Sequence, residues 1–267
     1  EKKDLSKVLV WPESTFPAPI FKDESAKEMV SNFAKEERVH ILLSTVDWEM
    51  QSNGSYRFFG ISVLFNPEGE IAGRYNKIFL IPFGESIPGS SWFPSWAAWL
   101  REMIPNISEF EPGQEFTAMP IGDVKISAPI CFDGFSPEII QKMVQNGANL
   151  IVLSGNLAWF GKSNAADYLE MITRWRSLEN RVPVVFATNS GYSSYWDATG
   201  QVRTRRMELF EVGHLSAVMK LAAYNSWYRG KSRWLIWFYC TLILIAFGYL
   251  IRHRKKIPIN QDGASGL

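Results

Sequence analysis

Short apolar runs of strand length alternate along the chain with longer stretches in which apolar residues recur at helical spacing. The predicted strands are 7–11, 39–46, 56–66, 70–80, 125–133, 150–154 and 182–190. The predicted helices are 25–37, with Met29, Phe33 and Ala34 as its apolar stripe, 137–147, from Pro137 to a C-cap at Gly147, and 167–180. Turn residues at 66–69 and 197–200 predict two hairpins. Helices alternating with strands and hairpins indicate an α/β body with a mixed sheet covered by helices.

The last apolar stretch, residues 234–251, contains 18 residues without a charge. A helix that crosses a membrane needs about 20 apolar residues. Basic residues lie on both sides of the stretch and Trp and Tyr near its ends, as at a membrane interface. We therefore predict a folded body over 1–228, one transmembrane helix with basic flanks over 229–254 and a disordered tail over 255–267. The alternative is a buried core helix, but such a helix seldom lacks a polar face over this length.

Composition and charge exclude several classes of protein. With 267 residues, 46% hydrophobic and 21% charged, the chain can bury a sizeable core and is not disordered as a whole. The net charge of +1 gives no indication of a nucleic-acid partner. Residues 1–233 hold 24 basic and 26 acidic residues (net −2), and 234–267 hold 4 and 1 (net +3). Three basic residues closely precede the apolar stretch and four follow it, which favours a cytoplasmic C-terminus. The first residues show no signal-peptide pattern and enter a strand at once, so we expect the chain to begin partway through a domain.

Cysteine and histidine are too few and too scattered for a disulfide framework or a metal site. Cys131 lies in the body and Cys240 in the apolar stretch, so we do not expect them to pair. The three histidines form no cluster with metal-ligand spacing, and we expect neither a metal nor another cofactor. If Cys131 is a nucleophile, its base is therefore expected to be a residue other than histidine.

Three polar residues follow apolar strands, where sites in α/β proteins collect. Glu13 follows 7–11, Lys77 ends the second arm of the first hairpin, and Cys131 ends 125–130. Together they could run acyl transfer: the thiol attacks a carbonyl, the carboxylate takes its proton and the ammonium stabilises the oxyanion. A nearby Lys77 would also lower the pKa of the thiol. Taken singly, each has a simpler explanation: Glu13 could cap a helix, Lys77 could be a solvated lysine, and Cys131 could be a buried inert thiol.

Several motifs resemble the nitrilase (carbon–nitrogen hydrolase) superfamily and, within it, the apolipoprotein N-acyltransferase family. These motifs are WPES (11–14), RYNKIFLIPFGESIP (74–88), ICFD (130–133), NLAWFG (156–161) and RWRSLENRVPVVFATNSG (174–191). The resemblance covers about residues 7–251. It implies a nitrilase-like α-β-β-α sandwich with mixed sheets, followed by one transmembrane helix.

The resemblance also implies a role for each matching residue. Cys131 would be the nucleophile, Glu13 the general base and Lys77 the residue that stabilises the oxyanion, while Glu85 would be a second essential carboxylate that supports the lysine. Three further residues match positions close to the nucleophile, namely the aromatic Phe132 and Trp159 and the supporting acid Asp133.

The sequence departs from the family pattern in four ways. The family has a strand and a long helix before the strand that leads into WPES, and several transmembrane helices before those; this sequence shows none of them, so we expect a fragment or a reduced relative. Phe132 stands where tyrosine is common, and Asp133 stands where glutamate is common, which shortens the side chain by one methylene. Leu157 replaces a usual aspartate, which puts any polar contact there in doubt.

The activity implied by the resemblance is an N-acyl transfer between two membrane substrates. A phospholipid would donate its acyl group to Cys131 as a thioester, and the amino group of a diacylglyceryl-cysteine at a lipoprotein N-terminus would accept it. The implied location is the bacterial cytoplasmic (inner) membrane, with the catalytic domain on the periplasmic, outer face. A membrane-anchored amidase or nitrilase that transfers the acyl group to water is an alternative, and an inactive scaffold on the same fold is another.

A tryptophan-rich segment, residues 89–105, has two interpretations. Spacings of three and four would place Trp92, Trp96 and Trp99 on one face of a helix. Such a face could pack in the core, or it could form a lid or interfacial helix that binds lipid.

Overall fold

A computed structural model describes residues 6–254 except 91, 105–108, 220 and 222–224. Contacts divide the chain into two units, Glu1–Asn225 and Ser226–Leu267, which are described separately. The first unit holds two β-sheets, and the second holds one long helix.

The first sheet has the order β1-β2-β3-β4, with β1 parallel to β2 and the other pairs antiparallel. Its strands are β1 (Val8–Val10), β2 (His40–Met50), β3 (Tyr56–Phe65) and β4 (Ile71–Asn76). The second sheet has the order β5-β6-β7-β8-β9, in which β6, β7 and β8 are parallel. Its strands are β5 (Met119–Ile121), β6 (Val124–Ser127), β7 (Leu150–Gly155), β8 (Val184–Thr188) and β9 (Ser194–Trp196). Each sheet therefore contains both parallel and antiparallel strand pairs, which confirms the predicted mixed arrangement.

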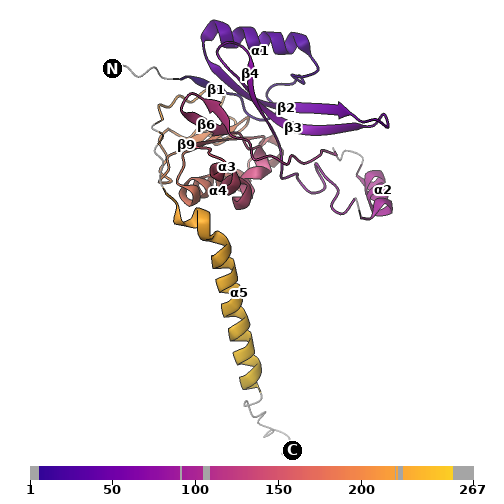
Figure 1. The fold of residues 1–267 in the computed structure, drawn as a ribbon, viewed down its shortest axis with the longest axis vertical. Coiled ribbons are helices and arrows are strands. Elements are labelled where there is room, and N and C mark those ends of the chain that lie inside the picture. Colours follow the sequence, from indigo (N-terminus) through magenta and orange to yellow (C-terminus); the bar gives the residue numbers. More distant parts are fainter. Residues whose placement is uncertain (1–5, 91, 105–108, 220, 222–224, 255–267) are drawn as a thin grey trace, which may run out of the picture. The chain divides into compact units, whose positions relative to one another are not determined.

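The two sheets pack face to face, and helices cover their outer faces (Figure 1). Helix α1 (Glu24–Glu37) packs on the first sheet, and α3 (Pro137–Gln145) and α4 (Ala165–Asn180) pack on the second. Between the sheets, Leu42 and Leu64 meet Ile126 and other apolar residues of the second sheet. The fold is the predicted α-β-β-α sandwich, because each sheet buries one face against its helices and the other against its partner sheet.

Local sequence explains where α1 begins and which face it buries. The side chain of Asp23 accepts a hydrogen bond from the N–H of Ala26 at 3.0 Å and so caps the helix. Ala34 is buried as expected, but Met29 and Phe33 are exposed, because the buried face runs through Ala26, Val30 and Ala34.

Several element boundaries differ from the expectations, and three of them lie at candidate residues. The strand predicted over 125–133 ends at Ser127, and a short 3₁₀ helix, η1 (Cys131–Phe135), begins at the nucleophile candidate. Strand β4 ends at Asn76, just before Lys77. The helix in the tryptophan-rich segment, α2 (Pro94–Met103), begins after Trp92.

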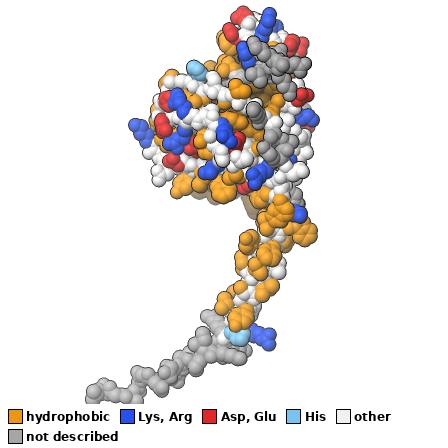
Figure 2. All heavy atoms as spheres, turned by 90° about the vertical axis from the view of Figure 1, so that its left-hand side faces the viewer, with side chains coloured by type: hydrophobic (Ala, Val, Ile, Leu, Met, Phe, Trp, Pro, Cys, Tyr) orange, Lys and Arg blue, Asp and Glu red, His pale blue; other side chains and the backbone are white. Residues whose placement is uncertain are grey.

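The second unit contains α5 (Trp227–Arg254). Within it, the 20 residues Trp234–His253 have a mean hydropathy of 2.1 and make one helix long and apolar enough to cross a membrane. Figure 2 shows hydrophobic side chains along the visible face of this helix. The predicted tail over 255–267 lies outside the described residues.

Candidate active site

Three loops of the sandwich bring Glu13, Lys77 and Cys131 together. Glu13 lies in the turn after β1, Lys77 follows β4, and Cys131 begins η1. The Lys77 Nζ is 3.8 Å from the Glu13 Oε1, and the charges of both Glu13 and Lys77 act on the Cys131 thiol. The three side chains therefore face one another although they are far apart in the sequence.

Lys77 is 2% exposed and is held by a second carboxylate, Glu85. Its Nζ donates a hydrogen bond of 2.7 Å to the Glu85 Oε1, while the Glu85 Oε2 accepts one of 3.0 Å from the N–H of Ile81. Burial alone would lower the pKa of Lys77, but the charges of Glu13, Cys131 and Glu85 outweigh it and raise this pKa. Lys77 therefore remains a cation in the site.

Cys131 is buried and has a positive φ of 48°, a backbone conformation uncommon for residues other than glycine. Burial and the negative charge of Glu13 raise the pKa of its thiol to about 12, although Lys77 acts in the opposite direction. Lys77 lowers the pKa of the thiol in the expected direction, but burial and the carboxylates outweigh this one cation, so the net shift of the pKa is upward. The thiol is protonated at neutral pH and needs a base when it reacts.

Glu13 is placed to be that base. Burial raises the pKa of its carboxyl, while the charge of Lys77 and the N–H of Asn156 oppose this shift. The Asn156 N–H donates to the Glu13 Oε2 at 2.8 Å, which leaves the Oε1 directed to the lysine side. A carboxylate with a raised pKa accepts a proton more readily.

Asp133, which is fully buried, joins the cysteine loop to the lysine loop. Its Oδ2 accepts hydrogen bonds from the Tyr75 hydroxyl (2.7 Å) and the Ile130 N–H (3.0 Å). Its Oδ1 accepts hydrogen bonds from the N–H groups of Phe79 (2.7 Å) and Ile78 (3.2 Å). The short aspartate side chain thus meets four donors, and its supporting role is positional.

Tyr75 and Asn156 were not among the residues singled out from the sequence. Tyr75 lies two residues before Lys77 and packs with residues of η1 and α3, so strand alternation from the lysine could have found it. Asn156 acts on Glu13 through its backbone N–H, and the residue type at a position does not indicate such a backbone hydrogen bond.

Leu157, which stands where aspartate is usual, is 2% exposed and packs among Leu153, Leu169 and Phe186. It makes no polar contact through its side chain, so its loop is anchored by apolar packing instead. Asn189 adds two hydrogen bonds to this loop, accepting from the Leu157 N–H and donating to the side chain of Asn156.

The aromatic candidates divide into two groups. Phe132 is partly buried and stacks between Phe79 and Phe135, with ring centroids 6.4 and 4.7 Å away. Trp159, in the short helix η2 (Ala158–Phe160), is 87% exposed. Phe132 is therefore part of the wall beside Cys131, whereas Trp159 is free to meet a ligand.

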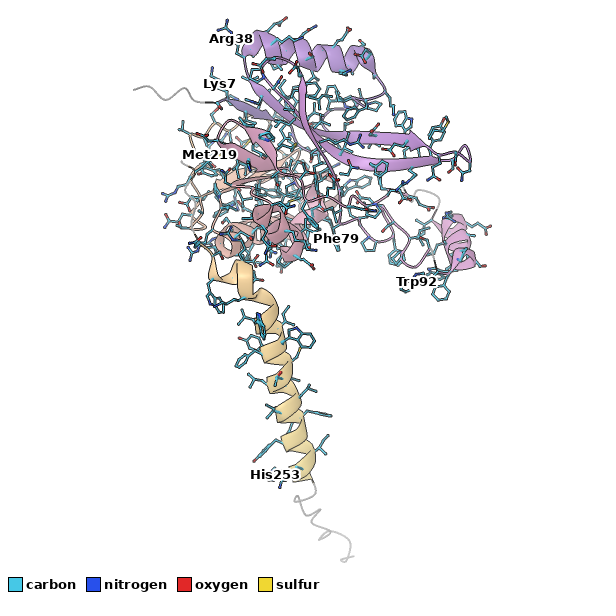
Figure 3. All side chains as sticks on the ribbon, in the orientation of Figure 1. Lys7, Arg38, Phe79, Trp92, Met219 and His253 are labelled. Carbon is cyan, nitrogen blue, oxygen red and sulfur yellow. The ribbon has the colours of Figure 1, made fainter. Side chains whose placement is uncertain are left out.

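The tryptophans of the 89–105 segment are exposed rather than packed in the core. Trp96 and Trp99 stack on each other at 5.2 Å on α2, while Ala97 and Leu100 form its buried side. Trp92 precedes the helix, on a segment that projects from the sheets (Figure 3). The structure contradicts the core-packing interpretation and the placing of Trp92 within the helix.

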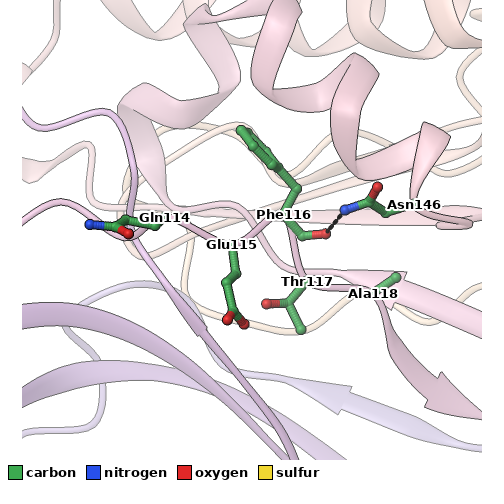
Figure 4. A pocket seen from close by; sticks show the side chains of 6 residues that line it. All are labelled: Gln114, Glu115, Phe116, Thr117, Ala118 and Asn146. Atoms are coloured by element: carbon green, nitrogen blue, oxygen red, sulfur yellow. Dashed lines mark hydrogen bonds between the residues drawn. The ribbon is translucent and has the colours of Figure 1, made fainter.

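A hollow elsewhere on the first unit is lined by none of the three converging residues. Its lining consists of Gln114, Glu115, Phe116, Thr117, Ala118 and Asn146 (Figure 4). The Asn146 side chain donates a hydrogen bond of 3.0 Å to the Phe116 carbonyl across it. Within the described ranges, no group of three or more His, Cys, Asp or Glu residues could hold a metal ion.

Comparison with known sequences gives consistent matches. The model of the family described as carbon-nitrogen hydrolase matches residues 5–229. A Geobacter metallireducens protein is 32% identical over 224 residues, which are 84% of this chain and 42% of that protein. A Shewanella oneidensis protein is 25% identical over 266 residues, which are 93% and 48% of the two chains. Both are named apolipoprotein N-acyltransferase, and this chain spans less than half the length of each.

Solved structures share the fold at low identity. A carbon-nitrogen hydrolase from Helicobacter pylori G27 has a TM-score of 0.56 at 20% identity, covering 76% of this chain and 73% of that one. An amidase from Nesterenkonia sp. AN1, with acrylamide added to its active-site cysteine, has a TM-score of 0.55 at 15% identity, covering 76% of both chains.

Proposed function

Because the chain belongs to the carbon–nitrogen hydrolase family, we propose that it is an N-acyltransferase that moves a fatty acyl group from a phospholipid to a lipoprotein. The acyl group passes through a thioester on Cys131 to the α-amino group of a diacylglyceryl-cysteine. The observation that carries this proposal is the meeting of a thiol, a carboxylate of raised pKa and a buried ammonium group. The names of the relatives support the choice of transferase.

The first half of the reaction forms the thioester. Glu13 accepts the proton of Cys131 as the sulfur bonds to the ester carbon, and the carbonyl electron pair moves to oxygen. Lys77 donates a hydrogen bond to that oxyanion, and Glu85 keeps the ammonium in place. The oxyanion then collapses, the ester C–O bond breaks, and Glu13 returns the proton to the departing lysophospholipid.

The second half transfers the acyl group to nitrogen. The neutral α-amino group attacks the thioester carbon, and Glu13 accepts the proton that this nitrogen loses. The C–S bond breaks as the amide forms, and the proton passes from Glu13 to the sulfur of Cys131. The enzyme returns to its starting state, so each turnover consumes one phospholipid and one amine.

The lipid nature of both substrates agrees with the apolar helix Trp234–His253. We place the protein in the bacterial cytoplasmic membrane, with the catalytic unit on the outer, periplasmic face and the C-terminus in the cytoplasm. The exposed Trp92, Trp96, Trp99 and Trp159 are suited to the interface, where aromatic rings with a polar edge are favoured.

The proposal is tested by intact-mass measurement on the whole chain after exposure to phosphatidylethanolamine. We expect a mass increase of one acyl group that is lost in Cys131→Ala and kept in Cys240→Ala, the matched change at the exposed cysteine. Adding a diacylated lipopeptide should remove the adduct and yield N-acylated lipopeptide. The absence of any Cys131 adduct would overturn the acyltransferase and favour an inactive scaffold.

An amidase or nitrilase is the second candidate, because an amidase shares the fold. The same three side chains would then pass the acyl group to water. Ammonia released from simple amides, without acylation of the lipopeptide, would favour this candidate over the first.

A further inference from the structure

The outer halves of β2 and β3 form a two-stranded extension of the first sheet with one apolar face. In the strand register Trp48 pairs with Phe58 and Met50 with Tyr56, so these side chains share a face. Farther along β2, the same face carries Ser44, whose hydroxyl lies 2.8 Å from that of Ser154 in the second sheet. The apolar face is therefore a continuation of the inner face of the sandwich.

Among the described residues, Phe110 pairs with the edge of this extension at Phe58, and the inner face beside it stays exposed. Figure 1 shows the β2–β3 hairpin extending past the other strands. Met50 is 71% exposed, Tyr56 54%, Phe58 41% and Val46 38%, although the matching positions deeper in the sandwich are buried. The rings of Trp48, Phe58 and Tyr56 follow one another at 6.3 and 6.4 Å. Large apolar side chains left open in a continuous row indicate a binding surface.

The opposite face of the same hairpin has a different composition. It carries Asp47, Glu49 and Arg57, with Arg57 paired to Glu111 at 3.4 Å, and its one large apolar side chain at these positions, Phe59, is buried. Exposed apolar side chains on this part of the hairpin are thus confined to one face.

The open row leads directly to the catalytic lysine. Gly60, the partner of Val46 in the register, accepts a hydrogen bond of 2.8 Å from the Lys77 N–H. A Cβ atom added to Gly60 would lie 3.6 Å from the Cβ and the Cδ of Lys77, so the lysine side chain crosses this same face. The row begins where the oxyanion is proposed to form.

We propose that this acyl strip, defined as Val46, Trp48, Met50, Tyr56 and Phe58, binds the fatty acyl chain of the phospholipid donor. The inference rests on the proposed function and identifies the surface that recognises its donor. The ester carbonyl lies beside Lys77 and Cys131, and the aliphatic chain follows the strip away from them.

The dimensions and chemistry of the acyl strip fit an aliphatic chain. Four residues of strand separate Gly60 from Tyr56, which is about 13 Å, comparable with an extended chain of roughly ten carbons. The strip has no charged member, and the Lys22 ammonium lies 6.0 Å from the centroid of the Trp48 ring. Burying one methylene group of the acyl chain completely strengthens binding by about fourfold, so covering it on one side only strengthens binding by about twofold.

The test compares donors of different chain length in the whole chain reconstituted with lipid. The rate of thioester formation is measured with dihexanoyl and didecanoyl phosphatidylethanolamine. In the wild type, four extra methylenes in the bound chain, at about twofold each, should favour the longer donor by about 16-fold. In the double variant Met50→Ser and Tyr56→Ser this preference should fall to about twofold, with the rate for the short donor nearly unchanged. Glu49→Ser, the adjacent exposed change on the opposite face, should keep the wild-type preference.

A second measurement makes the acyl strip testable without turnover. A phosphatidylethanolamine with a photoreactive diazirine in its acyl chain is crosslinked to the Cys131→Ala variant, and the adducts are mapped by peptide mass. Adducts within residues 46–58 support the strip, even if no thioester forms and the acyltransferase proposal fails. Adducts confined to other segments, or a double variant that slows both donors equally, would overturn it. If labelled lipopeptide crosslinks to the acyl strip and labelled phospholipid does not, the strip binds the acceptor, and this result would also overturn the proposal.

Discussion

Replacing Asp133 with asparagine tests whether this buried carboxylate holds the two loops of the site together. Its two oxygens accept hydrogen bonds from the N–H groups of Ile78, Phe79 and Ile130 and from the Tyr75 hydroxyl. The amide keeps one acceptor oxygen and places an NH₂ group against two donors. Of these partners only the tyrosine hydroxyl can turn round and accept, so at least one buried backbone N–H loses its acceptor.

The magnitude follows from these contacts. An unsatisfied buried donor costs about 1–3 kcal/mol, and the remaining hydrogen bonds lose the strengthening that an ionised acceptor provides. Removing a charge whose burial is unfavourable offsets part of this loss. We expect Asp133→Asn to lower the free energy of unfolding by about 2–4 kcal/mol. For a unit of this size that corresponds to a fall in Tm of about 4–16 °C. Tyr75→Phe removes one hydrogen bond and leaves three, so its fall in Tm should be about half as large.

Near-ultraviolet circular dichroism of the whole chain in detergent follows this unfolding, because it reports the packing of aromatic rings in the first unit. Asp123→Asn, at the exposed turn between β5 and β6, is the matched control and should leave Tm within about 2 °C. A Tm for Asp133→Asn equal to that of the control would refute the reasoning, as would a larger fall in Tyr75→Phe than in Asp133→Asn.

Three further predictions concern other parts of the chain. Glu13→Gln keeps an acceptor for the Asn156 N–H but cannot take a proton, so thioester formation should slow by about 10²–10⁴-fold in an intact-mass time course. Because burial raises the pKa of Glu13, the wild-type rate should be lost as pH falls through a midpoint above 4.5, and a midpoint at or below 4.5 would contradict this. Leu157→Asp places a carboxylate in an apolar cluster and should cost about 3 kcal/mol or more, visible as a lower Tm; an unchanged Tm would show that the loop can turn the side chain outward. Trp96→Ala should reduce quenching of tryptophan fluorescence by brominated phospholipid and leave Tm nearly unchanged, whereas equal losses in both would favour a role in folding.

The sequence predicted the layers of the fold because burial of one face of a strand or helix produces a periodic pattern of apolar residues. The apolar runs marked most of the strands, and the turn at 66–69 correctly joined β3 to β4. The apolar pattern placed the end of β6 incorrectly. Cys131 adopts a positive φ, and the N–H of Ile130 donates a hydrogen bond to the Asp133 side chain instead of to a strand. A hydrogen bond that forms after the chain leaves the sheet produces no pattern of apolar and polar residues in the sequence. Strand β5, only three residues long, was missed for lack of a detectable run.

The candidate site could be predicted only where a residue type carries the chemistry. Glu13, Lys77 and Cys131 were expected from their positions at strand ends, and the structure brings them together. Tyr75 bonds to an acid 58 positions away, and the backbone of Asn156 bonds to a carboxylate 143 positions away. Such contacts depend on how the two sheets are stacked, which the local sequence does not encode.

The raised pKa of Cys131 also bears on how the acyl acceptor is chosen. A thiol whose pKa is about 12 leaves poorly as an anion, so it must be protonated as the thioester breaks. Glu13 supplies that proton after taking one from the acceptor, and it can do so equally for water and for an amine. Selection therefore has to come from groups that control access to the thioester. An acyl chain lying along the acyl strip would cover the face beside Lys77 and exclude water there, while a lipid-borne amine could still approach from the membrane. Removing the strip should consequently raise the ratio of hydrolysis to lipopeptide acylation, measured as free fatty acid against N-acylated lipopeptide, and an unchanged ratio would mean that water is excluded elsewhere.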